Sequence, residues 1–265
     1  MIDFHNHVIP QMDDGAKDLE TSLNMLNHAA EQGITDVVNT VHYQHPKMIN
    51  KKINFEKVKG EINKLQNQLN KNQIPIKLHF GAEVFYLPNL NEIIDDPLTT
   101  FGDGKYMLIE FSTIALPKKY KETLFKLKMS GVTPIIAHPE RYRQIQNDIS
   151  IITNLLEAGC IMQIDAGSPL GLFGKDAKRT SIEILKNNWC QLLGSDAHND
   201  KNRNFCLRDA IVFINSFVDY NTKSLVNENP RKILNGDLLT FDIEYDSPSE
   251  SLSFLSRLKR RINIT

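Results

Sequence analysis

The chain has 265 residues, a formal net charge of −1 at pH 7 and 41% hydrophobic residues. This length is usual for a single α/β barrel, and the hydrophobic fraction is enough for a sizeable core. The near-neutral charge argues against nucleic-acid binding and against disorder. No apolar run approaches the ~18 residues of a membrane span, and no signal-peptide pattern is present at the N-terminus.

Three cysteines, Cys160, Cys190 and Cys206, are odd in number and show no Cys-x-x-Cys spacing. This usage is typical of a reduced cytoplasmic protein rather than of a disulfide scaffold. We therefore expect a cytoplasmic protein. The sequence leaves the oligomeric state open.

Strands and helices alternate along the chain. Apolar, β-branched segments predict strands over residues 2–6, 34–40, 76–81, 105–111, 132–137, 160–165 and 189–193. Helical spacing of apolar residues predicts helices from Asp18 to Gly33, over 55–72, from Tyr120 to Gly131, and over 149–158, 175–188 and 204–218. Asn229 and Pro230 read as the N-cap and first residue of a short last helix.

Seven apolar strands joined by helices predict a parallel sheet, either covered on both faces or closed into a barrel. No repeat or linker divides the chain, so we expect one domain over 1–240 and a tail over 241–265. The tail is acidic over 242–250 and amphipathic over 252–262. We expect a solvated terminal helix there, with partner or lipid binding as the alternative.

Residues 3–15, DFHNHVIPQMDDG, carry the first candidate site. On a strand, residues i and i+2 project from the same face, so His5 and His7 lie side by side. Asp14 follows in a turn that ends with glycine, and its neighbour Asp13 is the alternative acid. These side chains predict one edge of a metal site.

Further metal-competent residues stand at the carboxyl ends of the predicted strands, where a parallel barrel carries its chemistry. With Asp14, the set is His5, His7, His42, Glu83, Glu110, His138, Asp196 and His198. Nine ligands are too many for one ion, which takes about four to six, so several ions and a bridging carboxylate are expected. We choose Glu110 as the bridge. Nitrogen and oxygen ligands without a thiolate suit Mn, Fe or Zn.

Two or three ions about 3.5–4 Å apart suit in-line displacement at phosphorus, which predicts phosphate ester hydrolysis by a metal-bound hydroxide. Arg141 and Arg203 follow ligands closely, and a guanidinium offers a bidentate fork to a phosphoryl group. Arg141 is the stronger candidate, whereas Arg203 is equally well explained as a surface residue. An amidohydrolase commonly needs a carbamylated lysine, and no lysine stands at the matching strand end.

Other polar residues have plainer explanations. His28 lies on an amphipathic helix and His79 inside a strand, so we expect surface and packing positions. His45 follows His42 on a loop, and metal or substrate contact is the minor alternative there. Asp165 ends a strand, and orienting a ligand imidazole is one role open to it. The glycine-rich loop 167–174 is either a rim of the site or a simple connection.

The ordered motifs DFHNHVIP with DDGAK, GAEVFY, IEFS, IIAHPERY, QIDAGS, LGSDAH and NPRKILNG carry a family resemblance. With them the chain resembles the PHP (polymerase and histidinol phosphatase) superfamily, and within it the bacterial manganese-dependent protein-tyrosine phosphatases of capsule and exopolysaccharide loci. The resemblance covers about residues 1–238. One departure is Tyr43, which stands where the family often has a second histidine.

The resemblance implies a distorted (β/α)7 TIM-like barrel, the PHP fold, with a three-metal Mn²⁺ site; Fe and Zn are the alternatives. It implies hydrolysis of phosphotyrosine on a bacterial tyrosine autokinase that regulates polysaccharide synthesis. The family's metal ligands carry over onto His5, His7, Asp14, His42, Glu83, Glu110, His138, Asp196 and His198, and its phosphate-binding arginines onto Arg141 and Arg203. No cysteine is followed six residues later by an arginine, which excludes a thiol-nucleophile phosphatase.

Two alternatives remain at this point. The first is a phosphoesterase of the same barrel that acts on histidinol phosphate or a nucleotide. The second is a catalytically weak metal-binding module that recruits a kinase through the basic end of the tail.

Overall fold

The computed structural model describes residues 1–218, 221–242 and 261–262. Its main sheet consists of β1 (Ile2–Asn6), β2 (Asp36–Tyr43), β3 (Lys77–Phe85), β4 (Tyr106–Glu110), β5 (Thr133–Ala137), β6 (Ile161–Asp165) and β7 (Leu192–Gly194). These strands are parallel and lie side by side in chain order. A parallel bridge between Asn6 and Ala197 joins the two edges. The predicted distorted (β/α)7 barrel is confirmed.

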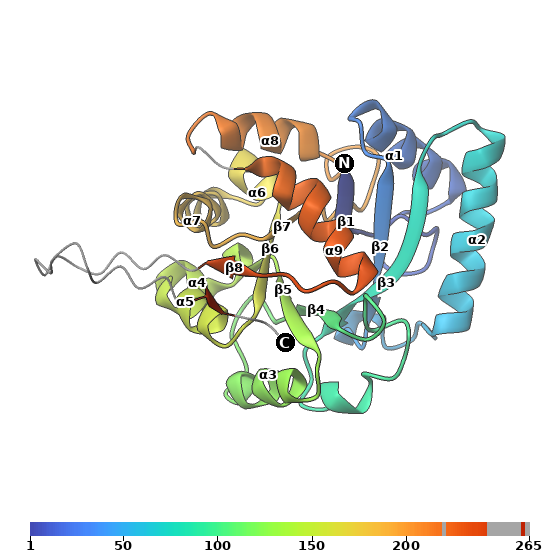
Figure 1. Ribbon diagram of the computed structural model, residues 1–265. Coiled ribbons are helices and arrows are strands. Elements are labelled where there is room, and N and C mark those ends of the chain that lie inside the picture. Colours follow the sequence, from blue (N-terminus) through green and yellow to red (C-terminus); the bar gives the residue numbers. More distant parts are fainter. Residues whose placement is uncertain (219–220, 243–260, 263–265) are drawn as a thin grey trace, which may run out of the picture.

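Helices surround the strands (Figure 1). They are α1 (Leu19–Glu31), α2 (Phe55–Lys71), α3 (Tyr120–Met129), α4 (Arg143–Asn147), α5 (Ser150–Glu157), α6 (Gly167–Leu170), α7 (Lys175–Lys186), α8 (Leu207–Asn215) and α9 (Asn229–Asn235). The Asp18 carboxylate accepts the Thr21 N–H at 2.8 Å, which confirms the predicted cap of α1. Within the described ranges, no helix is long and apolar enough to cross a membrane.

Two apolar clusters follow from the alternation of side chains along the strands. The larger cluster packs outward-facing residues, such as Val37 and Val41 of β2, against the helices. The smaller cluster contains the inward-facing residues at the start of the strands: Ile2, Phe4, Val38, Leu108, Ile135, Ile161 and Leu192, with Phe101 from a loop and Ile233 from α9. Helix α9 crosses the barrel on this side (Figure 1). A Cβ on Gly81 would lie 2.1 Å from the Phe101 ring, so β3 needs glycine there.

Several predicted boundaries are wrong. Strands β2 and β3 extend past 40 and 81, and pair His42 with Glu83, because backbone hydrogen bonding continues where the apolar pattern stops. Strand β7 is shorter than the predicted 189–193. Asn229 does not cap α9: a π-helical turn over Ser224–Glu228 leads directly into this helix, and the Asn229 amide donates to the Gln191 carbonyl at 2.9 Å.

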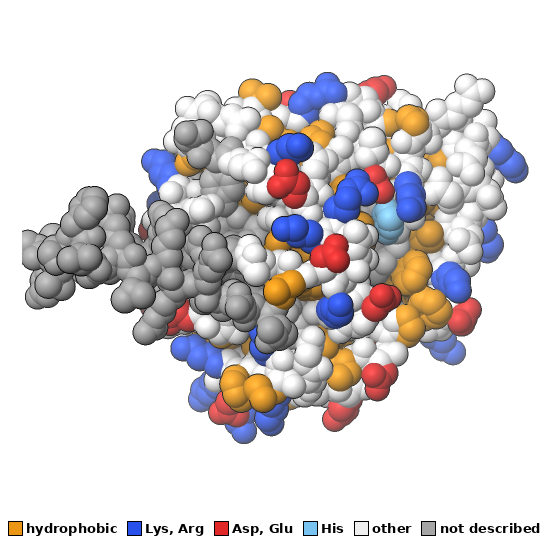
Figure 2. Space-filling view, in the orientation of Figure 1, with side chains coloured by type: hydrophobic (Ala, Val, Ile, Leu, Met, Phe, Trp, Pro, Cys, Tyr) orange, Lys and Arg blue, Asp and Glu red, His pale blue; other side chains and the backbone are white. Residues whose placement is uncertain are grey.

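On the part of the α9 face that the described residues form, side chains of both charge signs are present. Lysine and arginine side chains are interspersed there with acidic ones (Figure 2). Of the tail predicted over 241–265, the structure describes Phe241–Asp242 (β8) and Arg261–Ile262 (β9), which pair as antiparallel strands. The predicted terminal helix is therefore wrong at Arg261–Ile262, and its other residues lie outside the described part of the chain.

Candidate metal centre and phosphate-binding cavity

The barrel interior changes from apolar to polar toward the carboxyl ends of the strands. Because inward positions recur every second residue, β2 presents Val38 and then His42, and β4 presents Leu108 and then Glu110. The strand pattern that builds the core therefore also aims the later polar side chains at the barrel axis.

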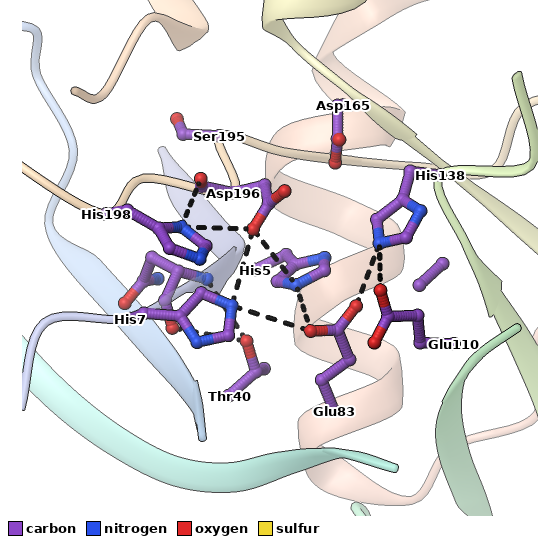
Figure 3. A network of polar contacts seen from close by, with 12 residues as sticks. His5, His7, Thr40, Glu83, Glu110, His138, Asp165, Ser195, Asp196 and His198 are labelled. Atoms are coloured by element: carbon purple, nitrogen blue, oxygen red, sulfur yellow. Dashed lines mark hydrogen bonds and ion pairs between the residues drawn. The ribbon is translucent and has the colours of Figure 1, made fainter. Parts of the chain in front are cut away.

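Strand β1 also directs polar side chains at the barrel axis, but it does so through an irregular register. Its register against β2 shifts between Asp3 and Asn6. Such a shift re-aims side chains, so Phe4 joins the inner apolar cluster while His5 also points inward. The rings of His5 and His7 lie 5.5 Å apart and face the same centre (Figure 3), as predicted.

Two further side chains enter from residues with left-handed backbone. His138 follows β5 with φ of 33°, and Asp196 follows β7 with φ of 47°. This conformation is costly for residues with a Cβ, and such strain often clusters at functional sites. Gly194 at the end of β7 lets His5 approach, because a Cβ on Gly194 would lie 2.4 Å from the His5 Cβ.

The Glu83 carboxylate faces the rings of His5, His7 and His138 (Figure 3). Its carboxylate oxygens are 2.8–3.5 Å from ring nitrogens of four imidazoles: His5, His7, His42 and His138. Glu110 is more peripheral, since its nearest imidazole nitrogens are 3.7 Å away. The geometry thus favours Glu83 over our expected Glu110 as the carboxylate shared between metal ions.

Asp196 and Asp14 complete the arrangement. One Asp196 oxygen is 3.3 Å from His7 Nε2, and one Asp14 oxygen is 3.3 Å from His42 Nε2 and 3.4 Å from His198 Nε2. All nine predicted ligands fall into four overlapping groups whose ligand atoms lie within 4.8 Å of one another: His7, Asp14, His42 and His198; His5, His7 and Asp196; His5, Glu83 and His138; and His42, Glu83 and Glu110. The structure therefore brings the whole predicted set together.

Hydrogen bonds on the far side of the rings orient these imidazoles. The Asp13 carboxylate lies 2.7 Å from His7 Nδ1, and the Gln163 side-chain oxygen lies 2.9 Å from His5 Nδ1. Both oxygens accept the ring N–H and so turn the Nε2 lone pair toward the cluster. Asp13, the alternative to Asp14 as a ligand in the sequence analysis, thus contacts His7 from the far side of its ring. Gln163 was missed, although its inward position in the strand over 161–165 was a usable signal.

Asp165 does not orient an imidazole, the role that the sequence left open to it. Its carboxylate accepts a hydrogen bond from Arg141 Nη1 at 2.8 Å. The same Arg141 nitrogen donates to Asp196 Oδ2 at 2.6 Å, and Arg203 Nη2 donates to that oxygen as well. Both predicted arginines therefore reach the edge of the metal-ligand cluster through Asp196.

Burial and crowding perturb the charges of the cluster. Burial alone would raise the pKa of Glu83, but the imidazoles of His5 and His42 outweigh it and hold this pKa well below its usual range. Burial, together with repulsion from Glu83, raises the pKa of Glu110 to about 7. Burial opposes protonation of His5 and His42, yet the Glu83 carboxylate and other acids nearby raise their pKa values to about 9 and about 10.

The donor set fits metal ions. Among the described residues, His5 Nε2, His7 Nε2 and Glu110 Oε2 are buried and have no hydrogen-bond partner. Buried polar atoms are normally paired, so their convergence indicates a bound cation. Imidazole and carboxylate ligands without a thiolate suit Mn, Fe or Zn.

A cavity of about 80 Å³ opens beside the cluster. Its lining residues are Asp14, His42, His45, Lys47, Glu83, Glu110, His138, Arg141, Asp196, His198 and Arg203. Lys47 was missed by the sequence interpretation, because a loop lysine carries no pattern. The cavity brings cationic donors of the arginines and Lys47 together with candidate metal ligands.

The remaining histidines have different surroundings. His45 lines the cavity, with its ring 4.6 Å from that of His42, so the minor alternative of a site contact is supported. His28 is half-buried on α1, and His79 pairs with Asp36 at 2.9 Å outside the site. The Tyr43 hydroxyl donates to Asp96, and Tyr43 is not among the residues that line the cavity.

Comparison with known proteins finds sequence relatives over most of this chain. The family model described as "Capsular polysaccharide synthesis, CpsB/CapC" matches residues 1–235. Tyrosine-protein phosphatase YwqE of Bacillus subtilis is 33% identical over 88% of this chain and 91% of the relative. Tyrosine-protein phosphatase CpsB of Streptococcus pneumoniae is 30% identical over 90% of this chain and 100% of the relative.

Solved structures show the same likeness. One chain from the crystal structures of YwqE from B. subtilis and CpsB from S. pneumoniae, described as unique metal-dependent tyrosine phosphatases, superposes with a TM-score of 0.83. It is 32% identical, over 89% of this chain and 95% of that one. A histidinol phosphate phosphatase from Lactococcus lactis shares the fold at 15% identity and a TM-score of 0.53, over 81% of this chain and 92% of that one.

Proposed function

This chain belongs to the CpsB/CapC family of capsular polysaccharide synthesis proteins, and from that premise we propose that it is a metal-dependent protein-tyrosine phosphatase. The observation that carries the proposal is the convergence of nine nitrogen and oxygen ligands, of which only Asp14 is exposed, beside a cavity that two arginines also line. Such a site suits hydrolysis of a phosphate ester.

The nine residues would hold the metal ions in the four groups found above, with Glu83 shared between them. We propose three ions, the number that the family resemblance implies; the nine ligands themselves suit several ions that share a carboxylate better than a single ion. We propose Mn²⁺ as the ion, with Fe and Zn as alternatives of the same ligand preference. When bound, these ions supply Lewis-acid activation of water and of the phosphoryl oxygens.

The chain's own residues bind and orient the substrate. Arg141 and Arg203 each use one edge on Asp196, which leaves other guanidinium donors for phosphoryl oxygens. Lys47 and His45 line the same cavity and offer donors to the departing phenolic oxygen. A phenol of pKa about 10 is a comparatively good leaving group, so a dedicated strong acid is not required.

The substrate we propose is phosphotyrosine on a protein, and its source a bacterial tyrosine autokinase that works in the cytoplasm and regulates capsular or exopolysaccharide synthesis. Membership of the capsular polysaccharide synthesis family supports this choice. The names of the relatives, which are tyrosine-protein phosphatases, support it too.

The decisive experiment measures metal content and hydrolysis of a phosphotyrosyl peptide before and after chelation. Chelation should abolish turnover, and re-addition of Mn²⁺ should restore it. Alkylation of cysteines in the same preparation should leave turnover intact, because Cys160 and Cys206 are buried and burial raises the pKa of each thiol to about 12. Activity that survives chelation and is lost on alkylation would overturn the proposal. Faster hydrolysis of histidinol phosphate or nucleoside monophosphates would reassign the substrate.

A further inference from the structure

An aromatic ring lies against both arginines of the cavity. Phe173, half-buried in the loop that follows α6, has the Arg141 Cζ atom 4.7 Å and the Arg203 Cζ atom 5.5 Å from its ring centroid. Both distances are within the range of cation–π attraction. One ring therefore contacts two guanidinium groups that belong to different segments of the chain.

The arginines need a second constraint besides their hydrogen bonds. Arg141 Nη1 and Arg203 Nη2 donate to the same oxygen of Asp196, so two like charges meet at one acceptor. A bond at one edge still allows a guanidinium to rotate about that edge. Contact with a ring restricts this rotation, because the flat group gains by staying against it.

Unused donors remain on this pair. Arg203 Nε is buried and has no partner among the described residues. The bonds of Arg141 to Asp165 and Asp196 both use Nη1. Since both arginines line the cavity, an anionic ligand there could accept from the donors that are left.

The loop that carries the ring is itself anchored. The Ser168 hydroxyl donates to Glu140 Oε1 at 2.6 Å, and the Asp165 N–H donates to the same buried carboxylate at 3.0 Å. A Cβ on Gly167 would lie 2.9 Å from the Phe173 ring, so the ring packs directly on this glycine. These contacts anchor α6 and seat the Phe173 ring beside Arg141 and Arg203, which line the cavity.

We propose that Phe173 is a positioning residue for phosphoryl binding, which holds Arg141 and Arg203 with their free donors directed into the cavity. The inference rests on the proposed function, because it assumes that these arginines bind the phosphoryl group. Phe173 acts through the two guanidinium groups.

The test compares Phe173→Leu, which keeps apolar bulk without a ring, with Phe173→Tyr, which keeps the ring. Phe125→Ala is the control, since Phe125 is exposed on α3. Calorimetric titration with inorganic phosphate gives the affinity of the metal-loaded protein for an anion without an aromatic group. Metal content and kinetics on a phosphotyrosyl peptide are measured in parallel.

Phe173→Leu should weaken phosphate binding by about five- to thirtyfold, the range that two partly exposed cation–π contacts allow, and raise KM with unchanged metal content. Phe173→Tyr and Phe125→Ala should bind phosphate like the parent. In an Arg141→Lys/Arg203→Lys background, Phe173→Leu should have little further effect. This loss of additivity would show that the ring acts through the arginines.

Unchanged phosphate affinity in Phe173→Leu would overturn the inference, and so would an equal loss in the double-lysine background. A raised KM for the peptide with normal phosphate affinity would also overturn it, since the ring would then contact the tyrosyl group. If the double-lysine variant itself bound phosphate normally, the arginine role in the proposed function would fail instead. If Phe173→Leu lost its metal or failed to fold, the test would pass to Phe173→Tyr. A phosphate affinity of Phe173→Tyr equal to that of the parent would support the inference, and a lower affinity would overturn it.

Discussion

Asp13→Asn removes one charge from a residue that we do not place among the metal ligands. The buried Asp13 carboxylate accepts from His7 Nδ1 at 2.7 Å, from the His42 N–H at 3.1 Å and from the Gly15 N–H at 3.0 Å. All three partners are donors. An asparagine has the same shape but must direct its NH2 group at one side of this arrangement.

Either orientation of the amide damages the site. With the NH2 group toward His7, Nδ1 must accept, so the proton moves to Nε2 and blocks the atom that faces the cluster. With the NH2 group toward Gly15, two donors meet and one buried N–H loses its acceptor, which costs about 1–3 kcal/mol. Loss of an orienting partner typically lowers metal affinity by about 10–100-fold. We expect a loss in this range together with a lower melting temperature of the metal-free chain.

Metal titration of the chelated protein, with phosphotyrosyl peptide turnover at saturating and limiting Mn²⁺, checks this expectation. Asp18→Asn is a matched control, because Asp18 caps α1 and asparagine is an equally good N-cap. Activity of Asp13→Asn should recover at high Mn²⁺. Parental metal affinity in Asp13→Asn would refute the orienting role of Asp13.

The other predictions concern the centre of the cluster. Glu83→Gln should lose more metal per chain than Glu110→Gln, because four imidazoles face Glu83. Native mass spectrometry measures the metal content of both variants, and an equal loss would contradict the choice of Glu83 over Glu110 as the shared carboxylate. In the metal-free chain, the pKa values of His5 and His42, about 9 and about 10, lie above the ~6.5 of an unfolded histidine. Their stabilising contribution is therefore present below about pH 6.5 and lost as pH rises through 9 to 10, and urea unfolding should show the free energy of unfolding falling over that interval. Metal affinity should rise over the same pH interval, because protons leave the rings. A metal affinity and an unfolding free energy that do not change with pH there would contradict the raised pKa values.

Much of the candidate site was predictable, because in a parallel barrel the carboxyl ends of the strands share one face. His42, Glu110 and His138 follow or end apolar segments, so their convergence required only the fold class. The predicted bounds of the strands were less accurate. His42 and Glu83 lie inside β2 and β3, since an inward-facing polar residue interrupts the apolar pattern without ending the strand.

Contacts between distant segments could not be predicted. Gln163 reaches His5 across 158 residues, and Asp165 meets Arg141 instead of an imidazole. These pairings depend on strand register and on the backbone after each strand, where His138 and Asp196 adopt left-handed conformations. Local propensity carries no information on either.

By itself, the sequence determined the fold class and nominated the nine candidate ligands and the two arginines. Periodicity and residue type set which face of a strand a side chain occupies. Only the tertiary structure decided how these groups divide their tasks. It puts Glu83 at the centre, assigns Asp13 and Gln163 to the rings, and lays Phe173 against both guanidinium groups. Those roles depend on distances between segments that meet only when the barrel closes.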